Sequence, residues 1–133
     1  MADRSERAEQ SDPPACAFVT EHALGAEVLR VFGEVDLSNA ADLKAAVLKI
    51  VADCGQDIVI DLTACDYMDS SGLGALVAAR RANPEQVRLV VPRRGAIHRI
   101  FEITGLSRQF RVFETVAEAL ATIPQMPAVK PPA

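Results

Sequence analysis

From Glu27 onward, short apolar runs that suit β-strands alternate with segments whose apolar residues recur at helical spacing. Such alternation predicts parallel strands joined by helical crossovers, because each helix returns the chain to the same end of the sheet. Upstream, residues 18–20 and 27–32 resemble two strands around a turn at Gly25, which predicts an antiparallel hairpin. We therefore expect one α/β domain with a small mixed sheet and about four helices packed against it.

The individual elements follow from local patterns. After the hairpin, strands are expected over residues 57–62, 86–91 and 110–113. Helices are expected in four places: after Ser38 with an end at Gly55, over residues 70–82, around Ile97–Phe101 with a stop at Gly105, and after Thr115. Ser38 and Thr115 are predicted N-caps, because a side-chain oxygen there can accept from the first helical turn. Residues 33–38 are predicted to form a loop.

The folded part is expected to span residues 16–123. Residues 1–15 are charged and polar and end in two prolines, which predicts a disordered tail. Residues 124–133 contain four prolines, which predicts an extended tail. A chain of 133 residues is typical of a single domain.

Composition excludes several function classes. The net charge of -4 gives no reason to propose nucleic-acid binding. No stretch approaches eighteen apolar residues and no signal peptide is visible, so we expect no membrane contact and a cytoplasmic location.

The cysteines, Cys16, Cys54 and Cys65, are odd in number and argue against a disulfide framework. For Cys65, a small semi-buried side chain is favoured over a redox role.

The segment Tyr67-Met-Asp-Ser-Ser-Gly-Leu-Gly-Ala75 carries the functional signal. Ser70 and Ser71 fall where the passage after a buried strand becomes a helix. The first turn of a helix has unpaired N–H groups and partial positive charge, so a phosphate there would be held well. Gly72 and Gly74 leave the turn without side chains, so that a partner could approach the backbone. The simplest alternative is an ordinary helix cap.

This segment resembles the signature of the STAS family, the bacterial anti-sigma factor antagonists. The similarity includes Gly33-Glu-Val-Asp-Leu-Ser38 upstream and Thr104-Gly-Leu106 downstream, and it covers about residues 18–123 in order. The resemblance implies the same fold, a small mixed sheet with helices packed against it.

The resemblance also implies a function. Such a protein binds an anti-sigma factor that is also a serine kinase, and thereby frees a sigma factor for transcription. The kinase inactivates it by phosphorylating Ser70, with Ser71 as the second candidate, and a phosphoserine phosphatase restores it. The protein is then a binding module and a kinase substrate, without cofactor, and not an enzyme. The implied contact residues are Asp36, Asp69, Ser70, Ser71, Gly72, Leu73 and Gly74.

Topology supports grouping Asp36 with Ser70. Loops that follow parallel strands gather at one edge of a sheet, so the loop after the second strand and the loop before Ser70 should be neighbours.

Two alternatives within the family stay open, namely a scaffold component of a stress-signalling assembly and a domain that binds a small ligand or nucleotide. No motif in the chain selects a nucleotide.

Other chemistries find less support. Asp61, Asp66 and Asp69 could suggest the metal site of a phospho-aspartate receiver, but no lysine occurs between Lys49 and Lys130 to complete it. The serines lie outside a Gly-x-Ser-x-Gly motif, and no Cys/His spacing suggests zinc. We therefore expect no metal and no catalytic residues; His22 lies near the tail, and His98 is expected to be a solvated helix residue.

A local excess of positive charge comes from Arg80, Arg81, Arg93, Arg94 and Arg99. Solvated helix ends explain these residues most simply. A role in docking an acidic partner surface is the alternative.

Overall fold

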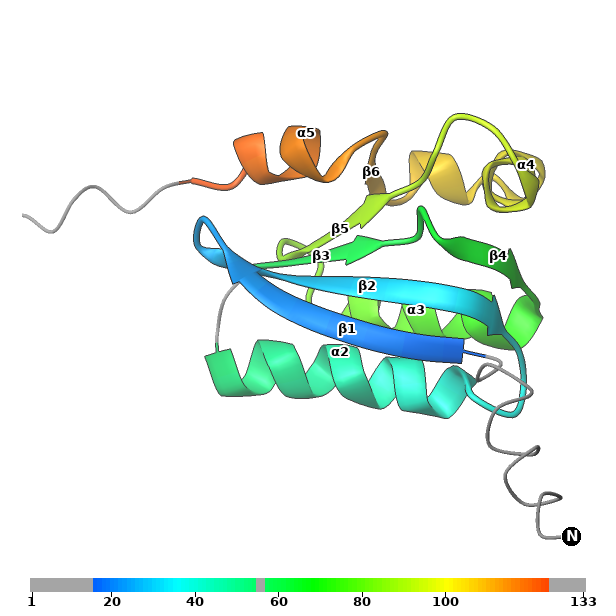
Figure 1. Cartoon of the computed structure of the whole chain (residues 1–133), viewed down its shortest axis with the longest axis horizontal. Helices are drawn as coiled ribbons and strands as arrows, with labels where there is room; N and C mark the ends of the chain where they lie inside the picture. Colours follow the sequence, from blue (N-terminus) through cyan, green and yellow to red (C-terminus); the bar gives the residue numbers. More distant parts are fainter. Residues whose placement is uncertain (1–15, 55–56, 125–133) are drawn as a thin grey trace, which may run out of the picture.

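A computed structural model of the chain describes residues 16–54 and 57–124 as a six-stranded mixed sheet with helices on both faces (Figure 1). Strands β1 (Cys16–Ala23) and β2 (Ala26–Val35) form the predicted antiparallel hairpin. The parallel strands β3 (Asp57–Asp61), β5 (Val87–Val90) and β6 (Arg111–Phe113) extend the sheet in the order β1-β2-β3-β5-β6. The predicted tails, Pro124 excepted, and the helix stop at Gly55 lie outside the described residues.

The helices agree with the sequence prediction. They are α2 (Ala40–Cys54), α3 (Ser70–Ala82), α4 (Ala96–Thr104) and α5 (Val116–Ala121), with a short 3-10 turn η1 (Leu106–Arg108) after α4. Helices α2 and α3 lie side by side below the sheet in Figure 1, and α5 covers the opposite face. Within the described residues, no helix combines the length and the apolarity needed to cross a bilayer.

Aliphatic side chains fill two cores, one on each face of the sheet. The larger lies between the sheet and α2, α3 and α4, and it includes Leu43, Leu76 and Phe101. The smaller lies under α5 and includes Val59 and Leu120. Burying one such side chain contributes about 1.5–3 kcal/mol, so the apolar faces of the helices fix their positions.

One strand was not predicted. Residues Cys65–Met68, expected to be part of a loop, form the short strand β4, which pairs in parallel with the end of β2. Consequently Gly33–Val35 belongs to β2 and not to a loop. The register shifts between Gly33 and Glu34, and the positive φ of 90° at Gly33 suits a bulge that a glycine forms without strain. Four residues are too few for an alternating pattern, so only the pairing with β2 reveals this strand.

Arg88 is a second feature that the apolar pattern of β5 concealed. Its side chain is buried, and one of its terminal nitrogens lies 3.3 Å from Asp57 Oδ2. Its Nε donates to Thr122 Oγ1 over 2.7 Å, which ties the end of α5 to the sheet. Burial, followed by the nearby charge of Arg111, lowers the pKa of Arg88, while Asp57 opposes that shift. A buried charge is retained only when it is paired in this way.

Gly72 and Gly74 offer a matched test of packing. A Cβ on Gly72 would lie 2.4 Å from Met68 Cγ and 2.9 Å from Val35 Cγ1, whereas a Cβ on Gly74 would meet no heavy atom within 4 Å. We expect Gly72→Ala to lower the free energy of unfolding by about 1–3 kcal/mol through overpacking. Gly74→Ala should leave it unchanged or raise it by up to about 1 kcal/mol, because alanine favours a helix. Urea unfolding of both variants measures the difference, and equal stabilities would contradict the packing at Gly72.

Candidate functional site

Asp69 organises the turn that carries the two serines. It is the N-cap of α3, and its Oδ1 accepts from the N–H of Ser71 over 2.8 Å and from that of Gly72 over 3.2 Å. The cap is therefore the aspartate and not a serine. Ser70 is the first residue of the helix and is exposed, whereas Ser71 is half-buried.

This cap changes what the helix start can offer to a phosphate. The sequence predicted free N–H groups at this turn, but the Asp69 carboxylate already binds two of them. A phosphate on Ser70 would have to compete with a carboxylate for the same donors. The turn therefore exposes Ser70 without providing a ready pocket for its phosphate.

The predicted neighbourhood of Asp36 and Ser70 is confirmed. Val35 at the end of β2 pairs with Met68 at the end of β4, and the backbone N–H of Asp69 donates to the carbonyl of Val35 over 3.1 Å. Asp36 follows Val35 directly, and Ser70 lies two residues after Met68. Two loops that are far apart in sequence thus leave the sheet together (Figure 1).

The Asp36 loop is held by its own polar side chains. Asp36 Oδ1 accepts from the hydroxyl of Ser38 over 2.6 Å and from its backbone N–H over 2.9 Å, and these bonds lower the pKa of Asp36. Asn39 Oδ1 accepts from the Asp36 N–H over 2.9 Å, while Asn39 Nδ2 donates to the carbonyl of Glu34. The Ser38 hydroxyl thus donates to Asp36 and does not cap α2, which begins at Ala40. The prediction that Ser38 is the N-cap is therefore wrong. Sequence reasoning missed Asn39, although Asn is a residue whose side chain commonly hydrogen-bonds nearby backbone in turns.

An exposed apolar side chain stands in the same loop. Leu37 is 80% exposed, and Tyr67, just before the serine turn, is 46% exposed. Sequence reasoning assigned no role to Leu37, and it named Tyr67 only as the first residue of the serine segment. An apolar residue in a short polar loop was the available signal, since such residues mark contact sites when they lie together at a surface.

The remaining predicted contact residues divide into buried and exposed positions. Gly72 is buried against Met68 and Val35, so the fold itself explains this glycine. Leu73 is half-buried and packs on the larger core. Gly74 is exposed and open, so a partner can approach α3 closely there.

The three aspartates considered for a metal site do not converge. Asp61 is buried and binds Arg30 over 3.1 Å and the Thr63 hydroxyl over 2.5 Å, so it serves the sheet. Asp69 caps α3, and Asp66 is exposed on β4. Across residues 16–54 and 57–124, no three His, Cys, Asp or Glu side chains group as metal ligands.

The arginines do not form one patch either. Arg80 lies over the ring of Phe110, with 5.8 Å from its guanidinium carbon to the ring centroid. Arg93 forms an ion pair with Glu114, and Arg81 lies on α3 beside α2. Arg80, Arg81 and Arg93 thus lie in three different surroundings.

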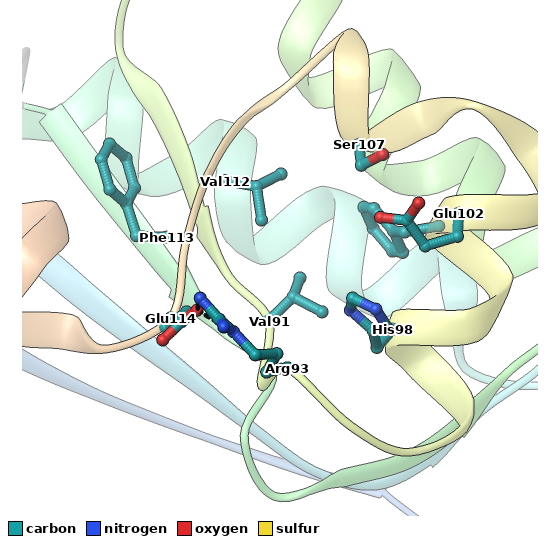
Figure 2. A pocket seen from close by; sticks show the side chains of 9 residues that line it. Val91, Arg93, His98, Glu102, Ser107, Val112, Phe113 and Glu114 are labelled. Atoms are coloured by element: carbon teal, nitrogen blue, oxygen red, sulfur yellow. Dashed lines mark hydrogen bonds and ion pairs between the residues drawn. The ribbon is translucent and has the colours of Figure 1, made fainter.

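A cavity of about 270 Å³ lies at the ends of β5 and β6, next to α4 (Figure 2). His98 and Glu102 line one side, the Arg93–Glu114 pair lines the other, and two valines lie between them. His98 is half-buried there, so it is not the fully solvated residue that the sequence suggested. The cavity is smaller than most ligand pockets, and the carboxylate of Glu114 already engages its arginine.

Comparison with known proteins agrees with this geometry. The family model of the STAS domain matches residues 17–119. The chain belongs to the STAS family. It is 37% identical over 114 residues to the anti-sigma-F factor antagonist RsfB of Mycobacterium tuberculosis, covering 85% of this chain and 93% of that protein. It is 41% identical over 81 residues to an anti-sigma-B factor antagonist of Listeria monocytogenes, covering 58% of this chain and 69% of that protein.

A solved structure shows the same fold. The crystal structure of an anti-sigma factor antagonist from Mycobacterium paratuberculosis superposes with a TM-score of 0.72 at 30% identity, covering 85% of this chain and 97% of that one. These relatives are named for antagonism of another protein and not for a reaction. That agrees with the prediction that this STAS domain is not an enzyme.

Cys65 allows a direct test of the redox alternative. Burial raises the pKa of its thiol to about 11, from an ordinary value near 9.0. We expect iodoacetamide at pH 8 to leave Cys65 unmodified in the folded protein and to modify it after unfolding in urea, as mass spectrometry can measure. Because the folded pKa is the higher one, this burial stabilises the fold fully below about pH 9 and loses its effect as the pH rises through about 11. Rapid alkylation of the native protein would instead support a redox role.

Proposed function

We propose that this STAS domain is an anti-sigma factor antagonist that binds an anti-sigma factor with serine-kinase activity and is switched off by phosphorylation of Ser70. The observation that carries the proposal is the position of Ser70, exposed at the first residue of α3 and directly beside the Asp36 loop. The similarity to named antagonists over 85% of the chain supports the same conclusion. Binding the anti-sigma factor frees its sigma factor in the cytoplasm, and a phosphoserine phosphatase resets the switch.

The proposed contact surface combines both loops and the exposed start of α3. Leu37 supplies an apolar contact, and Asp36 supplies a charge held ionised by its bonds to Ser38. Asp69, Ser70 and Ser71 border this surface from the other loop. Gly72 and Leu73 set the position of α3 from below, while Gly74 leaves its outer face open.

Exposure favours Ser70 over Ser71 as the phosphate acceptor. A kinase must bring the serine hydroxyl to the γ-phosphate of ATP, which requires an accessible side chain. Ser70 is exposed, whereas Ser71 is half-buried. Ser71 therefore stays the second candidate.

The surroundings of Ser70 explain how a phosphate would act. It adds about -1.5 to -2 charges beside Asp69 and near Asp36. Because Asp69 already occupies two donors of the first turn, the phosphate gains little inside the domain. Its charge stays at the surface. Burying that charge against a partner costs desolvation free energy, and the charge repels neighbouring carboxylates. The modified surface therefore releases the partner.

Two alternatives are less well supported. A scaffold component of a stress-signalling assembly would use the same fold, but no feature of the described residues favours further scaffold contacts. The cavity beside α4 gives little support to binding of a small ligand or nucleotide, because its volume is only about 270 Å³ and its Arg93 is paired with Glu114.

The phosphorylation site is tested with the purified anti-sigma factor that co-purifies with the wild-type chain. Incubation with this partner and ATP should add one phosphate, on Ser70, as peptide mass spectrometry can locate. Ser70→Ala should abolish incorporation and keep binding, whereas Ser70→Asp should weaken binding at least about tenfold, or about 1.4 kcal/mol. Ser71→Ala serves as the matched control. Incorporation on Ser71 alone would move the acceptor by one residue, and no incorporation at all would remove the switch.

The Asp36 loop is tested by charge reversal. Asp36→Arg should weaken binding of the same anti-sigma factor by more than about 1 kcal/mol, because reversing a charge at an interface leaves its partner group unpaired. Asp66→Arg, at an exposed position of β4, is the control for net charge. Calorimetric titration measures both. Unchanged binding by Asp36→Arg would restrict the contact surface to the serine turn.

A further inference from the structure

A shallow groove runs along the outer side of α2 and α3 and begins at the serine turn. Its larger part has a volume of about 620 Å³, and a smaller part of about 240 Å³ reaches Ser71. The two parts share Lys44, Gly74 and Ala78, so they form one continuous depression, the α2–α3 groove. The two helices lie side by side along its length (Figure 1).

Gly74 leaves the floor of the α2–α3 groove without a side chain, although the packing of the domain does not require a glycine there. Gly72 is a glycine because a Cβ there would collide with Met68 and Val35. Gly74 has no such reason, since a Cβ there would meet no heavy atom within 4 Å. A glycine inside a helix is unfavourable relative to alanine, so its presence at Gly74 indicates that something outside the domain needs the space.

Two cations line the α2–α3 groove. Lys44 and Arg81 line it, and neither has an ion-pair partner among the described residues. By contrast, Lys49 on α2 is paired with Asp53 over 3.0 Å. In a chain of net charge -4, two unpaired cations beside an apolar floor form a local surface that complements an acidic segment.

We propose that the α2–α3 groove docks an acidic helical segment of the same anti-sigma factor, extending the contact from Ser71 to Arg81. This inference rests on the proposed function and adds the chemistry of the partner's second contact. Arg81 lies ten positions after Ser71 on α3, a length of about 15 Å that two to three turns of a partner helix can follow. Small side chains on the floor let such a helix approach, and its carboxylates pair with Lys44 and Arg81.

Two other occupants fit less well. Nucleic acid binding depends on neutralising many phosphates, and the α2–α3 groove offers two cations. A second copy of this chain would not explain why the groove opens at the serine turn, where the proposed partner already binds. Continuity with that turn and the charge of the groove together select the acidic segment.

The test compares four variants for binding to the anti-sigma factor by calorimetric titration. Gly74→Leu fills the α2–α3 groove, and the double variant Lys44→Glu with Arg81→Glu reverses its charge. Ala45→Leu and Lys49→Glu are the matched controls, because both change exposed positions of α2 that do not line the groove. Circular dichroism confirms that each variant is folded; should Gly74→Leu fail to fold, the double charge reversal decides.

We expect each groove variant to weaken binding at least tenfold, with the controls within threefold of the wild type. Groove variants that bind as tightly as the wild type would overturn the proposal. So would a groove variant that changes only self-association in sedimentation. Ser70→Asp in the same titration distinguishes failure of the groove proposal from failure of the proposed function. If Ser70→Asp weakens binding while the groove variants do not, only the groove proposal is contradicted. If the wild type binds no anti-sigma factor, the proposed function itself is contradicted.

Discussion

The candidate site depends on one backbone hydrogen bond, from the N–H of Asp69 to the carbonyl of Val35 over 3.1 Å. It closes the pairing of β2 with β4, and so it brings the Asp36 loop next to the serine turn. The close fit of Gly72 over Met68 and Val35 then sets how near α3 approaches these two strands. A larger residue at position 72 would lift the helix start, together with Ser70, away from the edge of the sheet.

Asp69 links the stability of α3 to its proposed regulation. By binding two N–H groups of the first turn, its carboxylate satisfies donors that a helix start otherwise leaves unpaired, which is typically worth about 1 kcal/mol. The same bonds leave little for a phosphate on Ser70 to gain within the domain. The charge of such a phosphate is then directed outward, where a partner must meet it. The same side chain thus caps α3 and leaves the charge of a phosphate on Ser70 to act on a partner.

How much could be predicted from the sequence differs between elements. The helix over residues 70–82 was predicted with its bounds, because helical spacing and the following Asn83-Pro84 are local signals. The neighbourhood of Asp36 and Ser70 followed from the rule that parallel strands share an edge. Strand β4 was missed, since its four residues are recognisable only by pairing with β2. Arg88 was also missed as a buried ion-pair residue, because its partners Asp57 and Thr122 come from other parts of the chain.

By itself, the sequence determined the class of fold, the order of its elements and the segment that carries Ser70, because apolar periodicity and turn residues act over a few neighbours. It also carried the similarity that identifies the family. Only the tertiary structure decided which role each aspartate and each glycine of the serine segment has. It showed Asp69 to be the cap, Gly72 to be a packing residue, and Gly74 to be open toward solvent. These roles depend on which atoms from segments far apart in the sequence are in contact. The spacing of residues along the chain does not give the distances between such atoms.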